Sequence, residues 1–460
     1  MKKILYLILS ILLFPSVGLC AIAFPGAEGF GAVTRGAYEI TNSPTIYRVT
    51  NLNASGAGSF QAAAEASGSR IIIFDVGGTI NLGTDGVRID DPYLTIAGQT
   101  APGDGIAIRG GDSEATIVVG THDVIIRGLR IRQGAIGVSS DGLGLNGNLG
   151  SGDVYDVIVD HCSITWGNDE NASHYDDVYR ITWSWNIIAE GLNGYESGYN
   201  MLLGSPGGVD LSVHHNLFAS TRERMPVLDA STETELINNV MYNCENRFVQ
   251  NRDGATVDIV GNYFKSGPMY ASSWKPIWCE GSACSVYLLG NIGPDRPTDT
   301  GDEWDITNDS TCNESTHKST ISVVRSVTNA VTITSPTDAY ADVLASDGAG
   351  AIVPARDAVD LRIVGNVTDG DGPADVFDDP DDVGGYPTLA SGSAWTDTDS
   401  DGMPDSWETT KFGDLDQDET TDYDSDGYYD LEEWINSFYE SEEEPTIIKK
   451  IMNYFRRLRG

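Results

Sequence analysis

Two acidic segments near the C-terminal end repeat one spacing of side chains. In each, carboxylates stand at positions 1, 3, 5, 9 and 12 of a twelve-residue stretch, and a glycine stands at position 6. Odd-spaced carboxylates converge on one cation, the glycine permits a sharp turn, and the final glutamate binds with both oxygens. A solvated acidic linker would need neither the glycine nor the glutamate there. The sequence therefore predicts two structural calcium sites, held by Asp397, Asp399, Asp401, Asp405 and Glu408 and by Asp422, Asp424, Asp426, Asp430 and Glu433.

The overall charge limits the partners that the chain can bind. Lys and Arg number 28 against 68 Asp and Glu, which gives a formal net charge of -40. A surface of this sign repels nucleic acid, and a polyanionic ligand would need bridging cations to bind it. We therefore expect no nucleic-acid partner.

A short pattern that recurs between residues 116 and 367 indicates the elements that position such sites. Each copy has an apolar strand, an asparagine or another small residue, and two more apolar positions; the last copy falls at residues 363–367. Strands this short, at this period and with almost no helical periodicity, are typical of a solenoid. An asparagine at the same bend of each coil can both donate and accept along the stack, so we predict an internal ladder. Steps of 24, 30, 23, 23 and 29 residues separate Cys162, Asn186, Asn216, Asn239, Asn262 and Asn291.

Changes of composition divide the chain into four parts. The first begins with Lys2 and Lys3, continues with an apolar run and ends in small residues, which is the layout of a secretory signal. We predict export to the extracellular or periplasmic space, without a transmembrane span, because the run is short and contains Pro15. The expected parts are a signal peptide at 1–23, the solenoid at 24–390, the calcium loops at 391–437 and an acidic, then basic, tail at 438–460.

The cysteines offer two candidate disulfides, and export permits such bridges. Cys279 and Cys284 would close a small loop, and Cys244 with Cys312 is the second candidate pair. Cys162 lies within an apolar strand pattern, so we expect it to be a free thiol in the core.

Seven stretches of the chain occur in an order that one family of proteins shares. They are AFPGAEGFG (23–31), VTNLN (49–53), TIAGQTAPG (95–103), DHCS (160–163), HHN (214–216), RMP (224–226) and RDAVD (356–360). Together they resemble the pectate lyases of the first polysaccharide lyase family, in particular its secreted bacterial branch with a calcium module. The resemblance implies an all-β fold, a right-handed parallel β-helix (solenoid), with a small C-terminal calcium-binding loop module.

The same resemblance implies a calcium-dependent lyase that cleaves polygalacturonate by β-elimination. A base removes the proton α to the uronate carboxylate, and the C4 glycosidic oxygen leaves. A hard cation on the carboxylate oxygens stabilises the enolate-like charge as a Lewis acid. By position in the family pattern Arg224 is the base, and Asp141, Asp169 and Glu170 hold the Ca²⁺ ion. A guanidinium is ordinarily always protonated, so this role requires a perturbed environment or a hydroxide as the acceptor.

Three positions depart from the family pattern. Asp229 stands where a second arginine is common, Tyr199 where a substrate-binding lysine is common, and Ser173 in place of an acidic ligand. The first two changes remove positive charge that would hold a uronate, so they bear on which substrate binds. We assign Tyr199, Arg222 and Asp229 to the substrate-binding site, and Arg222 and Lys265 are candidates to supply the missing charge.

Plainer roles stay open for several of these residues. Arg224 is alternatively a surface arginine that pairs with Glu223 or Asp229. Asp169 and Glu170 are alternatively an ordinary polar turn. Three histidines lie in or beside strands and suit packing or hydrogen-bonded ladders better than catalysis: His161, His214 and His215.

Two other functions also stay open at this stage. A β-helical glycoside hydrolase would use two or three carboxylates and would release no unsaturated, ultraviolet-absorbing product. A non-catalytic glycan-binding solenoid is favoured if Tyr199 and Asp229 mark a decayed site. In each case we expect a monomer whose partner is an acidic, uronate-containing polysaccharide.

Overall fold

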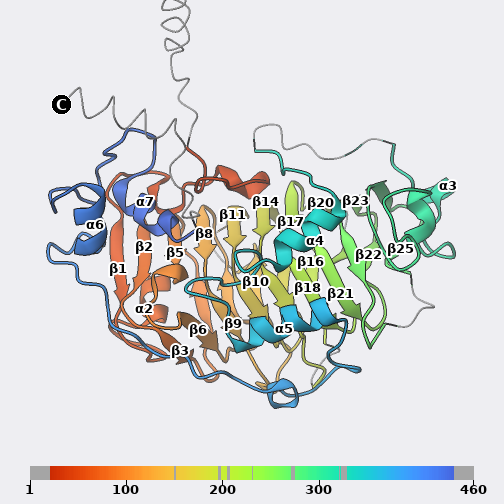
Figure 1. Ribbon diagram of the computed structural model, residues 1–460, viewed down its shortest axis with the longest axis horizontal. Coiled ribbons are helices and arrows are strands. Elements are labelled where there is room, and N and C mark those ends of the chain that lie inside the picture. Colours follow the sequence, from red (N-terminus) through yellow and green to blue (C-terminus); the bar gives the residue numbers. More distant parts are fainter. Residues whose placement is uncertain are drawn as a thin grey trace, which may run out of the picture.

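The computed structural model describes residues 21–149, 152–194, 198–204, 208–229, 232–270, 275–320, 322 and 329–439. The predicted signal up to residue 20 and the predicted tail from residue 440 lie outside these residues. The described chain winds into three sheets that run side by side along one axis, and each coil passes through sheet 1, then sheet 2, then sheet 3 (Figure 1). In all three sheets, neighbouring strands are parallel and come from successive coils.

Sheet 1 has two strands more than the others, because the chain between its first two strands contains a short helix and no strand, and because the last strand of the solenoid also belongs to sheet 1. Sheet 1 contains β1 (Thr45–Val49), β2 (Arg70–Phe74), β5 (Leu94–Ala97), β8 (Val124–Arg127), β11 (Val154–Asp160), β14 (Val178–Ser184), β17 (Leu211–His214), β20 (Glu233–Ile237), β23 (Thr256–Val260) and β26 (Ser285–Leu289). Sheet 2 contains β3 (Gly78–Asn81), β6 (Ile106–Arg109), β9 (Arg130–Arg132), β12 (Ser163–Thr165), β15 (Ile187–Ala189), β18 (Leu217–Thr221), β21 (Val240–Cys244) and β24 (Tyr263–Lys265). Sheet 3 contains β4 (Val87–Ile89), β7 (Ala115–Val119), β10 (Asp141–Asn146), β13 (Ala172–Tyr175), β16 (Met201–Gly204), β19 (Val227–Leu228), β22 (Val249–Arg252) and β25 (Ile277–Glu280).

One continuous apolar core fills the inside of the coils. Alternate side chains of each strand point inward, so Ile, Leu and Val from all three sheets pack together along the axis. The short helix α2 (Phe60–Ala64) buries Phe60 against the first coil, and its N-cap Ser59 accepts a hydrogen bond from Ala62 N at 3.2 Å. The solenoid predicted from the repeat is therefore confirmed.

The asparagine ladder is also present, at the bend between sheets 1 and 2. Each side-chain amide donates to the amide oxygen of the asparagine one coil further on. The distances are 3.0 Å from Asn186 to Asn216, 3.0 Å from Asn216 to Asn239, 3.0 Å from Asn239 to Asn262 and 3.1 Å from Asn262 to Asn291. All five side chains are fully buried, which confirms their structural role.

The last predicted copy of the repeat, residues 363–367, is not a strand, and that part of the prediction is wrong. These residues lie in helix α5 (Ala358–Asp369). Asp357 caps its N-terminus by accepting from Val359 N and Asp360 N, and Gly370 ends it at a left-handed φ of 74°. Val359, Ile363 and Val367 are four residues apart and bury one helical face, a spacing that overrides the short strand-like run within it.

After β26 the chain turns back along the solenoid. Helix α4 (Pro336–Leu344) lies against β21 and β24, α5 follows it across sheet 2, and the chain then returns to the first coils (Figure 1). No described helix is both long and apolar enough to cross a bilayer. The remaining helical elements are η1 (Phe30–Val33), η2 (Gly36–Tyr38), η3 (Gly98–Thr100), η4 (Glu303–Ile306), α3 (Glu314–His317), η5 (Pro380–Val383), α6 (Asp405–Lys411) and α7 (Asp430–Ser437).

Helices α6 and α7 form a C-terminal lobe, residues 395–439, on the outer face of sheet 1. Leu431, Trp434 and Ile435 of α7 pack with Ile71 and Ile73 of β2. The predicted calcium loops therefore lie beside the first coils of the solenoid, although they come from the last part of the sequence (Figure 1).

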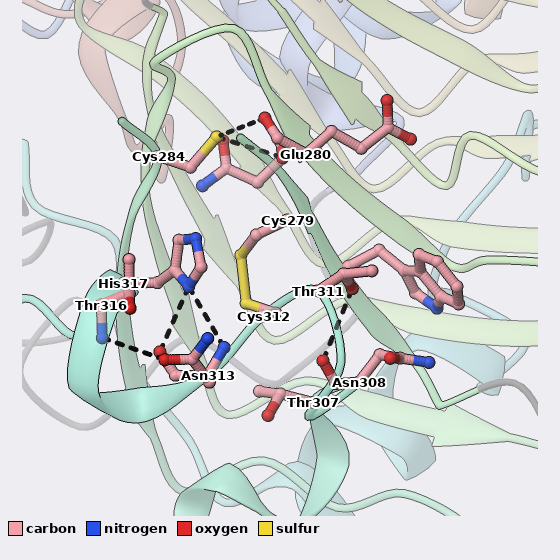
Figure 2. The surroundings of a disulfide bond; sticks show 12 residues. Cys279, Glu280, Cys284, Thr307, Asn308, Thr311, Cys312, Asn313, Thr316 and His317 are labelled. Atoms are coloured by element: carbon pink, nitrogen blue, oxygen red, sulfur yellow. Dashed lines mark hydrogen bonds between the residues drawn. A yellow bond between two sulfur atoms is a disulfide. The ribbon is translucent and has the colours of Figure 1, made fainter. Parts of the chain in front are cut away.

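The disulfide differs from both predicted pairs. Cys279 of β25 bonds to Cys312, with Cα atoms 4.6 Å apart, where the segment after η4 folds over the last coil (Figure 2). Cys284 and Cys244 are buried free thiols that donate to backbone oxygens, Cys284 to Asn251 O at 3.3 Å. The pairing of Cys279 with Cys284 and that of Cys244 with Cys312 are thus wrong, whereas Cys162 is a buried free thiol as predicted.

Candidate active site

Three carboxylates that were predicted as calcium ligands lie together on the outer face of sheet 3. Asp141 begins β10, and Asp169 and Glu170 precede β13 one coil further on. One oxygen of each lies within 4.8 Å of the other two. Ser139 Oγ donates to Asp169 Oδ2 at 2.7 Å, and Ser173 Oγ and Glu170 N donate to Asp141. Ser173, the departure from the family pattern, therefore orients a carboxylate of the cluster.

The electrostatics of this carboxylate cluster favour a divalent cation. Burial raises the pKa of Asp141 to about 7, although hydrogen bonds from Ser173 and Glu170 N oppose the shift. Burial and the charge of Asp141 raise the pKa of Glu170 well above its usual value. Crowded, buried carboxylate oxygens are the donor set that Ca²⁺ prefers, and a bound cation would favour their ionised forms. The residues present thus fit the calcium ion that the resemblance implies.

Arg224 contacts the carboxylate cluster, although it lies two coils further along the solenoid than Glu170. It precedes β19 with a left-handed backbone φ of 68°, and its guanidinium forms an ion pair with Glu170. The guanidinium carbon lies 3.4 Å from the ring centroid of Tyr199, which precedes β16. Glu170, Tyr199 and Arg224 thus come from three successive coils and form one row along the solenoid. Only 16% of the Arg224 side chain is exposed.

The two acids considered as plain partners of Arg224 bind other arginines. Glu223 pairs with Arg247 at 2.8 Å, and Asp229 pairs with Arg252 at 2.9 Å. The guanidinium of Arg224 is accordingly turned toward the carboxylate cluster.

A cavity of about 410 Å³ opens beside the carboxylate cluster and gives a substrate access to it. Besides the cluster it is lined by Glu114, Ser139, Asn146 and Tyr175, whose side chain is 53% exposed. Sequence reasoning missed Glu114 and Ser139, because both are isolated polar residues in loops without a recognisable spacing. A larger cavity, about 700 Å³, lies between the first coils and the C-terminal lobe and contains none of the predicted site residues.

Comparisons with known proteins decide the family. Probable pectate lyase C of Aspergillus flavus is 34% identical over 446 residues, which cover 94% of this chain and 97% of that protein. Probable pectate lyase C of Emericella nidulans is 33% identical over 423 residues, which cover 90% and 92%. The chain belongs to the pectate lyase family. The predicted resemblance and the enzyme class, a carbon–oxygen lyase that acts on polysaccharides, are confirmed.

Solved structures show the same fold at low sequence identity. A pectate lyase bound to a hexasaccharide has a TM-score of 0.53 and 14% identity, over 73% of this chain and 99% of that one. The cedar pollen allergen jun a 1 has a TM-score of 0.52 and 16% identity, over 68% of this chain and 90% of that one. No family model matches the chain. The predicted parallel β-helix is therefore confirmed.

The two residues considered as replacements for the missing positive charge lie in different places. Arg222 lies two residues before Arg224, and its Nε donates to Glu245 at 3.1 Å. Lys265 lies on sheet 2 and donates to Val367 O and to Tyr340 Oη. Lys265 is thus held by α4 and α5, on a different sheet from the carboxylate cluster.

Two of the three predicted packing histidines, His161 and His215, form a stacked row with Trp185 along sheet 1. The ring of Trp185 stacks on those of His161 and His215, with centroids 5.9 and 4.5 Å apart. His214 and His215 share a contact of 3.1 Å between their Nδ1 atoms. This arrangement agrees with the packing role and provides no contact with the carboxylate cluster.

The two predicted calcium loops have the same local fold. Asp397 accepts hydrogen bonds from Ser400 N at 2.7 Å and Gly402 N at 3.0 Å, and Asp422 accepts from Asp426 N and Gly427 N at 3.2 Å each. In each loop the first three acids bring one oxygen each within 4.8 Å of the others; these are Asp397, Asp399 and Asp401, and Asp422, Asp424 and Asp426.

The acids at positions 9 and 12 of the loops differ in their contacts. Asp405 accepts from Thr398 N and Oγ1 at 2.7 Å, and Asp430 accepts from Tyr423 N at 3.1 Å, so both brace their loop backbones. Glu433 pairs with Lys411 at 2.9 Å. Both oxygens of Glu408 are buried with no hydrogen-bond partner among the described residues, and burial, Asp401 and Asp399 raise its pKa to about 7. The first loop thus presents an unmatched carboxylate that a cation would satisfy.

Proposed function

We propose that this chain cleaves polygalacturonate by β-elimination at the carboxylate cluster beside Arg224. The observation that carries the proposal is the ion pair between the Arg224 guanidinium and Glu170, which is one of the three clustered carboxylates. A cationic donor next to an oxygen-rich cation site suits a sugar acid, whose carboxylate and α-proton must be handled together.

The reaction removes one proton and breaks one carbon–oxygen bond. The proton at C5, α to the uronate carboxylate, leaves to a base, and its electron pair forms the C4–C5 double bond. The C4–O bond breaks, and the departing sugar oxygen takes up a proton. The product therefore carries an unsaturated uronate at its new non-reducing end.

Residues of this chain hold the reacting groups in place. Asp141, Asp169 and Glu170 are the proposed ligands of Ca²⁺, and a bound Ca²⁺ ion supplies Lewis-acid stabilisation of the uronate carboxylate. Arg224, which Glu170 and the Tyr199 ring hold in place, is the group proposed to act on the α-proton. Because arginine ordinarily keeps its own proton and Arg224 is paired with the Glu170 carboxylate, Arg224 acts by holding the hydroxide that accepts the proton.

We also propose two structural calcium ions in the C-terminal lobe, one in each acidic loop, and export of the chain through its first 23 residues. The exported protein would be a calcium-loaded monomer. The unmatched Glu408 supports the first of these ions, and the shared hydrogen-bond pattern of the two loops supports the second.

A panel of polyuronates tests the proposed function. The chain is expected to release product that absorbs in the ultraviolet from polygalacturonate with calcium and to stop when a chelator is added. Cleavage that yields reducing ends without this absorbance would instead indicate a hydrolase, and binding without cleavage would indicate a glycan-binding solenoid.

A further inference from the structure

The arginines near and beyond Arg224 on the outer face of sheet 3 all form ion pairs with acidic residues, among the residues that the structure describes. Among the described residues between 222 and 280, three guanidiniums besides that of Arg224 are bonded to four carboxylates. None of these guanidiniums presents an unbalanced positive charge to a ligand. The pairs are Arg222–Glu245 at 3.1 Å, Arg247–Glu223 at 2.8 Å, Arg247–Glu280 at 2.6 Å and Arg252–Asp229 at 2.9 Å.

Asp229 and Arg252 are the pair that the β-helix register fixes most directly. Leu228 of β19 pairs with Asn251 of β22, so the residues that follow them stand side by side on the outer face. Nε and Nη2 of Arg252 both bond to Asp229 Oδ2, at 3.1 and 2.9 Å. On its other side Arg252 is in register with Glu280 of β25. The two side chains of the pair are 25% and 21% exposed, so a ligand can reach them.

Such a surface discriminates between the two forms of a uronate. The positive charge of these arginines is already offset by Asp229 and Glu280. A free carboxylate would therefore gain little attraction from the arginines and would be repelled by the two acids. A methyl ester has no charge, still accepts hydrogen bonds through its carbonyl, and avoids this repulsion. Specificity of this kind arises from what the surface repels as much as from what it attracts.

We infer that the sugar units lying over β19, β22 and β25 are methyl-esterified uronates, and that Asp229 is the residue that sets this preference. This inference rests on the proposed function, in which a free carboxylate is required at the cluster of Asp141, Asp169 and Glu170. The substrate is therefore a partly esterified polygalacturonate, with an acid at the reacting unit and esters on the units next to it.

Kinetics of Asp229→Asn against two substrates test the inference. The amide keeps the shape of the side chain and removes the carboxylate charge that is bonded to Arg252. We expect the ratio of kcat/KM for polygalacturonate to kcat/KM for partly esterified pectin to rise at least tenfold, through a lower KM for polygalacturonate. Asp156→Asn is the matched control, because Asp156 pairs with Arg180 at 2.6 Å on sheet 1 and its loss changes the net charge equally.

Arg252→Gln provides the opposite change. It removes the positive charge that offsets Asp229, so the same ratio is expected to fall below that of the wild type. Mass spectrometry of wild-type products from esterified pectin should find a free acid on the unsaturated end unit and methyl esters on the units beside it.

Three results would overturn the inference: unchanged ratios in both variants, an equal shift in Asp156→Asn, or products whose neighbouring units carry only free acids. A wild-type chain that yields unsaturated product from neither substrate would instead refute the proposed function itself. Thermal unfolding of each variant shows that the fold is retained.

Discussion

Tyr199 makes a contact that its predicted role in substrate binding does not include. Its ring lies under the guanidinium of Arg224. A cation over an aromatic face gains about 0.5 to 2 kcal/mol. The contact and the Glu170 ion pair together fix where the guanidinium points, so Tyr199 positions Arg224.

Removal of the Tyr199 ring should therefore lower kcat more than it changes KM. We expect Tyr199→Leu to reduce kcat about 3- to 30-fold, from the loss of the cation–π contact, and Tyr199→Phe to restore most of the rate. Steady-state kinetics on polygalacturonate measure this split. If Tyr199→Phe is as slow as Tyr199→Leu, the hydroxyl rather than the ring matters, and the positioning role is wrong.

Glu235 is a buried acid away from the site that makes stability depend on pH. Burial and the carboxylates of Asp258 and Asp210 raise its pKa from 4.5 to about 7, against a hydrogen bond from Ser212. Between these values the unfolded chain releases the proton while the folded chain keeps it. The folded state therefore loses stability as the pH rises from 4.5 to 7, by at most about 3 kcal/mol.

Glu235→Gln should remove this pH dependence. We expect the variant to unfold at a higher temperature than the wild type at pH 8 and at nearly the same temperature at pH 4. Glu65→Gln, at an exposed position, is the control. A difference that is equal at both pH values would show that titration of Glu235 is not its cause.

At the scale of elements, the solenoid was predictable and the helices that return along it were not. The asparagines recur because one bend needs one donor and one acceptor in each coil, so a single residue type marks the fold. Residues 363–367 have the same local pattern as a coil. However, Val359 extends their buried positions into a helical face, and Asp357 caps the N-terminus of that helix. A window of five residues cannot distinguish these two structures, whereas a window of twelve can.

The site shows the same division between local and distant information. The carboxylate cluster followed from the family pattern, but the contact between Arg224 and Glu170 spans 54 residues and depends on how three coils stack. The disulfide was missed for a similar reason. Cys279 lies five residues from Cys284, yet Cys312 reaches it only because the chain folds over the last coil.

For the whole molecule, the C-terminal lobe connects the end of the chain to its first coils. Arg35 pairs with Glu432 at 2.6 Å, and the rings of Tyr38 and Tyr429 stack with centroids 4.5 Å apart. Arg48 of β1 forms an ion pair with Asp397, the first acid of the first loop. A calcium ion in that loop would share Asp397 with Arg48, so calcium binding and the contact between the lobe and the solenoid should be coupled.

Calcium removal tests this coupling. Calcium at one hundred times its Kd adds about 2.7 kcal/mol of stability per site, so we expect a clear rise in the unfolding temperature, which calorimetry measures. Glu408→Gln should reduce that rise, whereas Asp416→Asn, at an exposed position in the same lobe, should not. Equal calcium responses in all three proteins would remove Glu408 from the proposed site.

The most direct test of the proposed chemistry is the rate of unsaturated product formation by Arg224→Ala. With calcium and polygalacturonate, the rate should fall at least 100-fold, in the usual range for loss of a proton-transfer group, while the unfolding temperature stays close to that of the wild type. Arg180→Ala, which removes an arginine from sheet 1, should keep the wild-type rate. A folded Arg224→Ala variant that still forms product at the wild-type rate would contradict the account.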